Sequence, residues 1–344
     1  MAERVLTLRE LNRTTLLRQL LLRRERLPVA RAIERVAALQ AQWAPAPYLA
    51  LWSRLDGFER RALERALVRG SVVKALLMRA TMHLVAARDH AWFDGCVREA
   101  RTSVRTRGRK PPPNRVVEQA LALTRGRPHT RPELMRALGY NPRSQDPEVI
   151  REYGWIVALA RLEQTPEAAF WGFRGSPLLR PAEHELPPLQ EAAPYLIRRY
   201  LAAFGPATQA DVSAWSGVAI RDLAPGFESL RLRAFRDERG RELLDLPRAP
   251  LAAGDVPAPP RLLPRWEELL LAHKDRSRVL PGEYRKQVIA ANGDVRQAIL
   301  VDGFVAGYWE QAGDRVVVHP FAPLPRTARR ELEEEAARLA AWLR

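Results

Sequence analysis

The order in which helical and strand-like segments follow one another is the feature that most constrains the fold of this chain. Segments with apolar residues at helical spacing precede a β-branched, apolar run, and this order recurs twice more. The first set covers 8–22, 29–39, 59–68 and 72–86, and the later sets cover 116–175 and 193–246. Three helices followed by a β-hairpin are the order of a winged helix. The sequence therefore predicts three tandem winged-helix modules.

The pattern changes to β beyond residue 260. Strand-like runs at 287–291, 295–301, 304–310 and 316–318 are separated by Asn292-Gly293 and Asp302-Gly303, which are strong hairpin signals. An amphipathic helix follows at 326–343. We therefore expect an α+β fold that has a small C-terminal antiparallel β-barrel or a curled sheet after the modules. The predicted parts are winged helix 1 at 1–115, winged helix 2 at 116–188, winged helix 3 at 189–250, and the barrel with its terminal helix at 251–344.

The charge of the chain points to a polyanionic partner. The 344 residues carry a formal net charge of +16, and only four of the 56 basic residues are lysines. Such a charge most simply suits a nucleic acid backbone, and arginine favours forked phosphate contacts. GC-rich codon usage would raise arginine and alanine together whatever the function, and this alternative stays open for the arginine excess.

Several other classes of protein are not supported by the sequence. Cys96 is the only cysteine, and the six histidines show no metal-ligand spacing, so we expect neither a disulfide nor a metal site. No signal-peptide core and no run of about 20 apolar residues occurs, so we expect no membrane partner. The expectation is a cytoplasmic monomer that associates with the nucleoid when it binds DNA.

Two glutamines stand at the end of the predicted helix 29–39. Gln40 and Gln42 precede Pro45 and Pro47, which we expect to stop that helix. On a continued helix the two side chains would diverge by about 200°, whereas in extended chain they share one side. They are either a pair of amides aimed at one point or simply solvated groups at a helix end. Trp43 beside them is either a core residue or a stacking platform.

Two further groups of residues are candidate DNA contacts. Arg79, Thr81 and His83 alternate with apolar residues in the second strand of the first hairpin, which would give a polar face for a groove. A structural role for His83 is equally open. The segment 101–115 has six basic and no acidic residues, and it holds the candidate phosphate contacts Arg101, Arg105, Arg107 and Lys110. The alternative is a solvated linker.

Several of these motifs together resemble the winged-helix DNA glycosylase family of AlkZ. They are Leu39-Gln40-Ala41-Gln42, Arg79-Ala80-Thr81-Met82-His83-Leu84, Gly205-Pro206-Ala207-Thr208 with Asp211 and Trp215, Asp275-Arg276-Ser277, and the run Val-Asp-Gly-Phe-Val-Ala-Gly-Tyr-Trp at 301–309. The resemblance implies three winged helices and a β-barrel around a basic cleft, and excision of bulky alkylated purines from DNA. It also implies that Gln40 and Gln42 carry the chemistry. Another branch of the family has Asp at the last position of this motif (Gln-x-Asp), and this chain has Gln42 at that position.

The amide pair restricts the substrate. Glycosidic cleavage passes through an oxocarbenium-like sugar, and ordinary glycosidases use two carboxylates to promote it. An amide can neither protonate a base nor deprotonate water, although it can position water and place a dipole beside a cation. The lesion must therefore be a good leaving group already, as cationic N7-alkylguanine or N3-alkylpurine is. We expect a monofunctional enzyme without metal or cofactor, acting on alkylated purines that include bulky natural-product adducts or interstrand crosslinks.

Two other functions are compatible with the charge and the modules. A transcriptional regulator would use winged helices for sequence readout without catalysis. A DNA-binding scaffold that has lost activity is the third possibility. Neither function requires the Gln-x-Gln motif.

Overall fold

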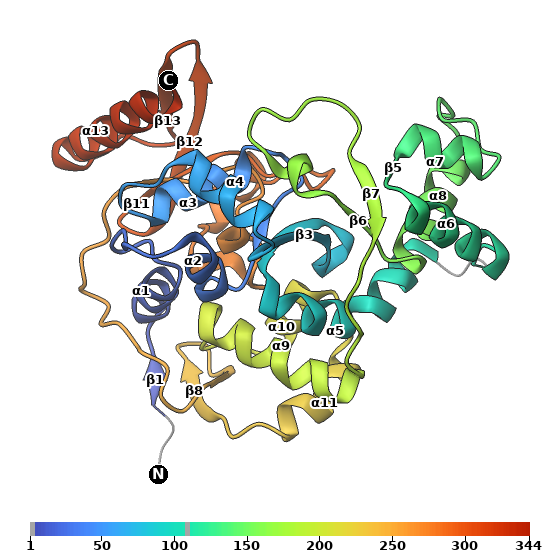
Figure 1. Cartoon of the computed structure of the whole chain (residues 1–344). Coiled ribbons are helices and arrows are strands. Elements are labelled where there is room, and N and C mark those ends of the chain that lie inside the picture. The colour runs from blue at the N-terminus through green and yellow to red at the C-terminus, as the bar shows by residue number, and fades with distance from the viewer. Residues whose placement is uncertain (1–3, 107–110) are drawn as a thin grey trace.

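The computed structural model describes residues 4–106 and 111–344, without the side chains of 103–106. Helices and small sheets alternate along the chain, which is therefore α+β as the sequence predicts (Figure 1). No helix among the described residues is long and apolar enough to cross a membrane.

The first predicted module contains more helices than the sequence pattern indicates. Its elements are α1 (Leu8–Arg18), α2 (Val29–Arg35), β2 (Leu39–Gln40), α3 (Ala46–Arg54), α4 (Arg60–Val68), β3 (Val72–Leu76), β4 (Met82–Ala86) and α5 (Ala87–Thr106). The strands form a sheet in the order β2-β4-β3. Thr7 caps α1 through a reciprocal capping box with Glu10, which the sequence allows one to predict.

The helix expected at 29–39 is shorter than predicted. It ends at Arg35, and Ala37 adopts a left-handed conformation with φ of 70°, after which the chain extends into β2. Pro45 and Pro47 do not stop a helix but stand at the beginning of α3. Proline suits the first turn because its missing N–H has no intrahelical partner there and its φ is already helical. The prediction for these prolines is wrong for that reason.

The second predicted module has a hydrophobic core of its own. It consists of α6 (Asn114–Gly126), β5 (His129–Thr130), α7 (Arg131–Ala137), α8 (Pro147–Leu159), β6 (Leu162–Gln164), a 3-10 turn η2 (Pro166–Ala169) and β7 (Leu178–Pro181). The hairpin expected at 170–175 is instead the longer β6–β7 pair, with β5 added in the order β5-β7-β6. Ala120, Leu134 and Ile156 centre the core, and helices α6, α7 and α8 lie to one side of the molecule, whereas η2 packs on α4 of the first part (Figure 1).

The third predicted module packs closely against the first. Its elements are α9 (Leu189–Phe204), α10 (Gln209–Ser216), α11 (Ile220–Glu228), β8 (Arg233–Asp237) and β9 (Glu242–Asp245). A strand from the beginning of the chain, β1 (Val5–Leu6), pairs in parallel with β8 and completes this sheet. Phe93 of α5 shares a core with Tyr200 of α9 and Trp215 of α10.

The C-terminal part contains a four-stranded sheet. Its elements are β10 (Arg261–Leu262), the 3-10 turns η3 (Glu268–Leu270), η4 (Arg276–Arg278) and η5 (Gly282–Tyr284), α12 (Arg285–Val288), β11 (Ala298–Val301), β12 (Phe304–Ala312), β13 (Arg315–Pro320) and α13 (Arg326–Leu343). The strand expected at 287–291 is not formed, because α12 and an isolated bridge from Ile289 to Val295 occupy that stretch. Among the described residues the strands follow the open order β10-β11-β12-β13, and no closed barrel is seen.

The first and last parts share one core. Tyr48 and Leu51 of α3 cluster with Leu262, Trp309 and Leu339, which come from β10, β12 and α13. The sequence predicts α13 over the residues it occupies, with Leu332, Ala336 and Leu339 on its buried face. Separate cores therefore do not mark all three predicted boundaries, and the division into four parts stays a prediction.

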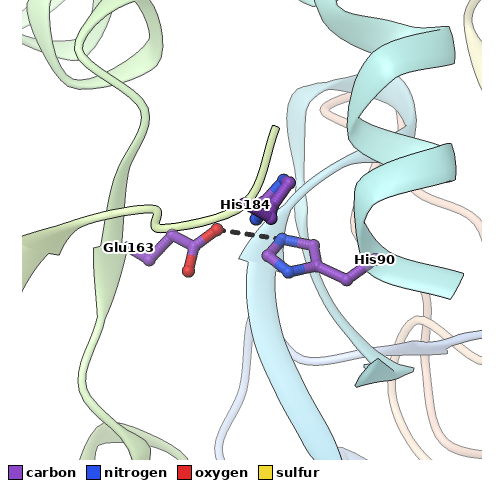
Figure 2. A group of neighbouring side chains, drawn as sticks. All are labelled: His90, Glu163 and His184. Atoms are coloured by element: carbon purple, nitrogen blue, oxygen red, sulfur yellow. Dashed lines mark ion pairs between the residues drawn. The ribbon is translucent and has the colours of Figure 1, made fainter. Parts of the chain in front are cut away.

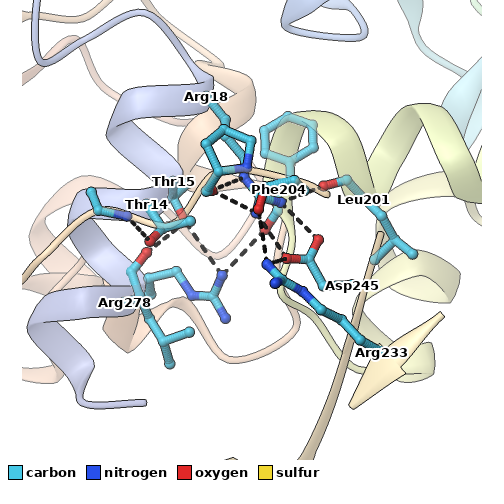
Figure 3. A network of polar contacts seen from close by, with 12 residues as sticks. Thr14, Thr15, Arg18, Leu201, Phe204, Arg233, Asp245 and Arg278 are labelled. Carbon is cyan, nitrogen blue, oxygen red and sulfur yellow. Dashed lines mark hydrogen bonds and ion pairs between the residues drawn. The ribbon is translucent and has the colours of Figure 1, made fainter. Parts of the chain in front are cut away.

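A buried polar network holds α1 against α9 and the segment that follows β9 (Figure 3). Arg18 donates through both terminal nitrogens to Asp245, at 2.9 and 2.8 Å, and also to the Leu201 carbonyl at 2.8 Å. Arg278 donates to Thr15 Oγ1 and to the Phe204 carbonyl, at 3.3 and 3.2 Å. Forked arginine–carboxylate contacts are geometrically specific, so this network fixes how the first and third parts meet.

Candidate active site

The Gln-x-Gln stretch begins in β2 beside β4, with Gln40, and ends at Gln42 in the bend that follows this strand. Gln40 stands opposite His83 in the β2–β4 register, and Ala41 N donates to the Met82 carbonyl at 2.7 Å. The helix does not continue through the motif, since the chain is extended at Gln40 and bends at Gln42. The two amides differ in exposure, however, since Gln40 is 8% exposed whereas Gln42 is exposed to solvent. Their two carbonyl oxygens are therefore not offered to solvent side by side in the free protein.

The two carbonyl oxygens also differ in their partners. Gln42 Oε1 accepts a hydrogen bond from Met82 N at 2.9 Å, which fixes the orientation of this amide. Gln40 Oε1 is buried and has no hydrogen-bond partner within the part of the chain that the structure describes. Leaving a buried acceptor unsatisfied costs about 1–3 kcal/mol. The unpartnered Gln40 Oε1 should therefore lower the stability of the fold.

Trp43 packs against the hydrophobic core. Its side chain is half-buried and contacts the cluster that includes Tyr48 and Leu51. The structure therefore shows a packing role for Trp43, and its use as a stacking platform stays a prediction.

The expected polar face of the first hairpin does not form. Arg79 and Ala80 have φ of 53° and 55° and belong to a 3-10 turn, η1 (Met78–Ala80), rather than to a strand. Thr81 Oγ1 donates to the Met78 carbonyl of the same turn at 3.1 Å. His83 is in β4, but it is 0% exposed. The alternation in the sequence runs through a turn, so it does not describe one face of a strand.

Arg79 and His83 converge on a buried carboxylate that the sequence pattern does not mark. Arg79 Nη2 and His83 Nε2 lie 2.8 and 3.0 Å from Glu268 Oε1, and Trp215 Nε1 donates to Glu268 Oε2 at 2.8 Å. Burial by itself would raise the pKa of Glu268, but Arg79 and His83 outweigh it and lower the pKa to about 2. Glu268 is therefore an anion that ties η3 to η1, β4 and α10.

Of the four basic candidates in 101–115, only Arg101 has a described side chain. It is 5% exposed, donates through Nη1 to the Leu76 carbonyl, and places Nη2 2.9 Å from Asp94 Oδ1. In this conformation Arg101 joins α5 to β3 and does not reach the surface. The side chain of Arg105, and the whole of Arg107 and Lys110, lie outside the described residues.

A buried lysine shares the sheet with the glutamine motif, although it is distant in sequence. Lys74 of β3 pairs with Leu84 of β4, which in turn pairs with Leu39 of β2. Burial lowers the pKa of Lys74 to about 8, and its Nζ donates to the Ala168 carbonyl at 3.1 Å. Its described contact is therefore with η2 and not with the glutamines.

Comparison with known proteins identifies the family. The family model described as DNA glycosylase AlkZ-like matches residues 33–342. An interstrand DNA cross-link repair glycosylase from Streptomyces sahachiroi is 26% identical over 94% of this chain and 93% of its own length. The solved structure of the Streptomyces sahachiroi DNA glycosylase AlkZ has the same fold, with a TM-score of 0.79, 22% identity, and coverage of 98% of this chain and 97% of that one. The chain therefore belongs to the AlkZ-like DNA glycosylase family, and it is a DNA glycosylase.

Proposed function

We propose that this glycosylase excises cationic N7-alkylguanine or N3-alkylpurine lesions from double-stranded DNA, with Gln40 and Gln42 at the reaction centre. The observation that carries the proposal is the buried, unpartnered Gln40 Oε1 beside a Gln42 amide that the backbone of Met82 holds in place. The net charge of +16 supports binding to the DNA backbone.

The chemistry of the pair decides the substrate class. Neither amide has a proton to give at neutral pH, so the leaving base must already carry the positive charge that protonation would supply. The Gln40 carbonyl is a dipole that can stabilise a developing sugar cation or accept a hydrogen bond from the attacking water. Gln42, with its carbonyl held by Met82 N, keeps its amide nitrogen for a second contact to water or DNA.

Binding of the lesion must uncover Gln40. Its Oε1 is shielded from solvent in the free protein, so the productive complex requires a local movement around β2 and the 42–45 turn. Local movements of this kind on substrate binding are common in enzymes whose active sites are completed only when the substrate binds.

The chemistry is proposed to be monofunctional. A lyase step needs an amine that attacks the sugar carbon, and the amine in the same sheet, Lys74 Nζ, donates to Ala168 instead. No metal or cofactor is needed for the proposed step.

The finer architecture is part of the same proposal. The hairpins β3–β4, β6–β7 and β8–β9 each follow a set of helices, which supports three winged helices; the C-terminal sheet would correspond to the barrel.

Because the Streptomyces relative is named for interstrand cross-link repair, we include bulky adducts and crosslinks among the proposed substrates. We propose that the protein works as a cytoplasmic monomer, nucleoid-associated when bound to DNA.

One assay tests the proposal. A duplex with a single N7-methylguanine is incubated with enzyme in excess, and abasic sites are counted after alkaline cleavage. We expect release by the wild type and at least a ~100-fold slower rate for the Gln40→Ala/Gln42→Ala double variant, as when a positioned dipole is removed. Gln119→Ala, an exposed glutamine on α6, is the matched control and should retain the wild-type rate. Equal rates for the double variant and the wild type would refute the proposed roles.

A further inference from the structure

We propose that His90, Glu163 and His184 form a binding site for a divalent transition-metal ion, with Zn²⁺ as the best fit. His90 lies on α5, Glu163 lies on β6, and His184 lies in the segment after β7, and the three side chains face one another (Figure 2). One ligand atom from each residue lies within 4.8 Å of the others. Glu163 follows His90 by 73 positions, and His184 follows Glu163 by 21 positions, so no short sequence motif indicates that they lie together.

The distances suit ligands gathered around a small cation. His90 Nε2 and Glu163 Oε1 are 2.9 Å apart, and the two imidazole rings have centroids 4.3 Å apart at an angle of 59°. Ligand atoms about 2.0–2.2 Å from a tetrahedral zinc ion are separated from one another by about 3.3–3.5 Å. Small side-chain rotations are therefore enough to bring all three ligand atoms to a shared ion.

A second observation points to a ligand. The His90 side chain is 7% exposed, and its Nε2 makes no hydrogen bond of acceptable geometry to any residue in 4–106 or 111–344, although the Glu163 carboxylate is close. A buried imidazole nitrogen is normally satisfied. A cavity of about 20 Å³ has His90 and Glu163 in its lining, together with Asp94, Arg101 and Arg161, whereas His184 lies outside this lining. That volume has room for roughly one water molecule or ion.

The surroundings supply the support that metal-bound histidines usually have. Asp94 Oδ2 lies 3.3 Å from His184 Nε2, where a carboxylate that orients a metal-bound histidine would be. Arg101 and Arg161 both pair with Asp94, at 2.9 and 3.2 Å, and Arg98 interacts with the same carboxylate. Glu163 is then the anionic ligand that offsets the charge of the ion.

The ligand types select the metal. Two imidazoles and one carboxylate suit zinc and its first-row neighbours, whereas calcium and magnesium prefer sets of oxygen ligands. Three protein ligands leave a fourth position for water.

The position of the site indicates a structural role. The part at 116–188 has its own core, and the proposed ion would fasten its β6 strand and the following segment to α5. The backbone is already close there, since a Cβ on Gly95 of α5 would lie 2.7 Å from the Pro187 carbonyl oxygen. His184 is thus held beside α5 by packing before any ion binds, which lowers the cost of assembling the site.

The test is metal binding by the full chain, independent of glycosylase activity. Protein stripped with a chelator is titrated with ZnCl₂ by calorimetry, and with CoCl₂ while the visible absorption of cobalt is recorded. We expect one equivalent of Zn²⁺ for the wild type and absorption typical of low-coordinate cobalt. Affinity should fall by about tenfold or more in Glu163→Gln, which preserves the shape of the side chain, and in His184→Ala.

His319→Ala is the matched control, because His319 pairs with Glu310 on the exposed face of the C-terminal sheet. It should bind Zn²⁺ as the wild type does, and near-UV circular dichroism confirms that each variant is folded. Absence of a stoichiometric Zn²⁺ site in the wild type, or equal affinity in Glu163→Gln and the wild type, would overturn the proposal.

Discussion

Gln42 is held by the backbone of Met82, whose N–H donates to Gln42 Oε1 across 2.9 Å. The contact joins the turn after β2 to the beginning of β4, next to the register pair of Gln40 and His83. One amide of the motif is therefore oriented before DNA binds, while the other keeps an unsatisfied carbonyl oxygen. This difference between two neighbouring glutamines underlies the account of catalysis.

The charge of the lesion should decide whether it is released. Because the amides supply no proton, a duplex with neutral O6-methylguanine should lose its base at least ~100-fold more slowly than one with cationic N7-methylguanine. Single-turnover release from the two duplexes, with binding measured separately for each, is the check. Comparable release of the neutral base would mean that another group in the site acts as a general acid.

Glu268 should be important for folding. Replacing Glu268 by Gln removes the anion that faces Arg79 and His83 and should lower the free energy of unfolding by about 3–5 kcal/mol, the usual effect of breaking a buried ion pair. Urea unfolding followed by tryptophan fluorescence measures it. Glu310→Gln, at an exposed pair with His319, is the control and should change stability by no more than about 1 kcal/mol. A loss at Glu268 as small as that of the control would contradict the role assigned to this carboxylate.

Acid should destabilise the protein partly through the same carboxylate. The folded-state pKa of Glu268 is lowered to about 2 from 4.5, so its contribution to stability is complete above pH 4.5 and is lost as the pH falls towards 2. The steepness of acid unfolding in this window should be smaller in Glu268→Gln than in the wild type. Identical acid-unfolding profiles for the two proteins would show that the carboxylate is not depressed in the folded state.

Arg101 should act on stability and not on the electrostatics of DNA binding. Arg101→Met removes the donor to the Leu76 carbonyl and one of the partners of Asp94, which keeps Arg161 and His184, so we expect a loss of about 1–3 kcal/mol in unfolding free energy. The slope of log affinity against log salt for undamaged DNA should stay as in the wild type. A phosphate contact at Arg101 would instead reduce that slope by about one.

Local signals in the sequence predict much of the fold. Thr7 with Glu10 and Thr130 with Glu133 form capping boxes, and the spacing of Leu332, Ala336 and Leu339 defines α13. These features depend on neighbours within one or two helical turns. The Asp302-Gly303 turn is also predicted from its own residues, and it takes positive φ of 47° and 79°.

Features that depend on distant residues could not be predicted in this way. Glu268 lies 185 positions from His83, and nothing around it in sequence indicates an ion pair. Arg79 fits a strand by alternation, but its φ is set by the turn that brings it to Glu268. His90 and Glu163 meet only because β6 packs against β3, which α5 also contacts.

For the candidate site, the sequence and the family resemblance select the two glutamines, but they do not reveal the environment of each. The extended alternative describes Gln40, which lies in β2, but not Gln42, which lies in the bend after it. The Gln42 carbonyl accepts a hydrogen bond from Met82 N, whereas the Gln40 carbonyl has no described partner. This difference follows only from the pairing of β2 with β4.

Replacement of Gln40 by Met separates a role of Gln40 Oε1 in the reaction from a role in folding, since Met has nearly the same shape and no polar atoms that require hydrogen bonds. Removing an unsatisfied buried acceptor should leave stability unchanged or raise it by up to about 2 kcal/mol. If Gln40 Oε1 acts in the reaction, single-turnover release of N7-methylguanine should nevertheless fall by ~100-fold or more. A Gln40→Met protein that is as stable as the wild type and equally active would contradict the account.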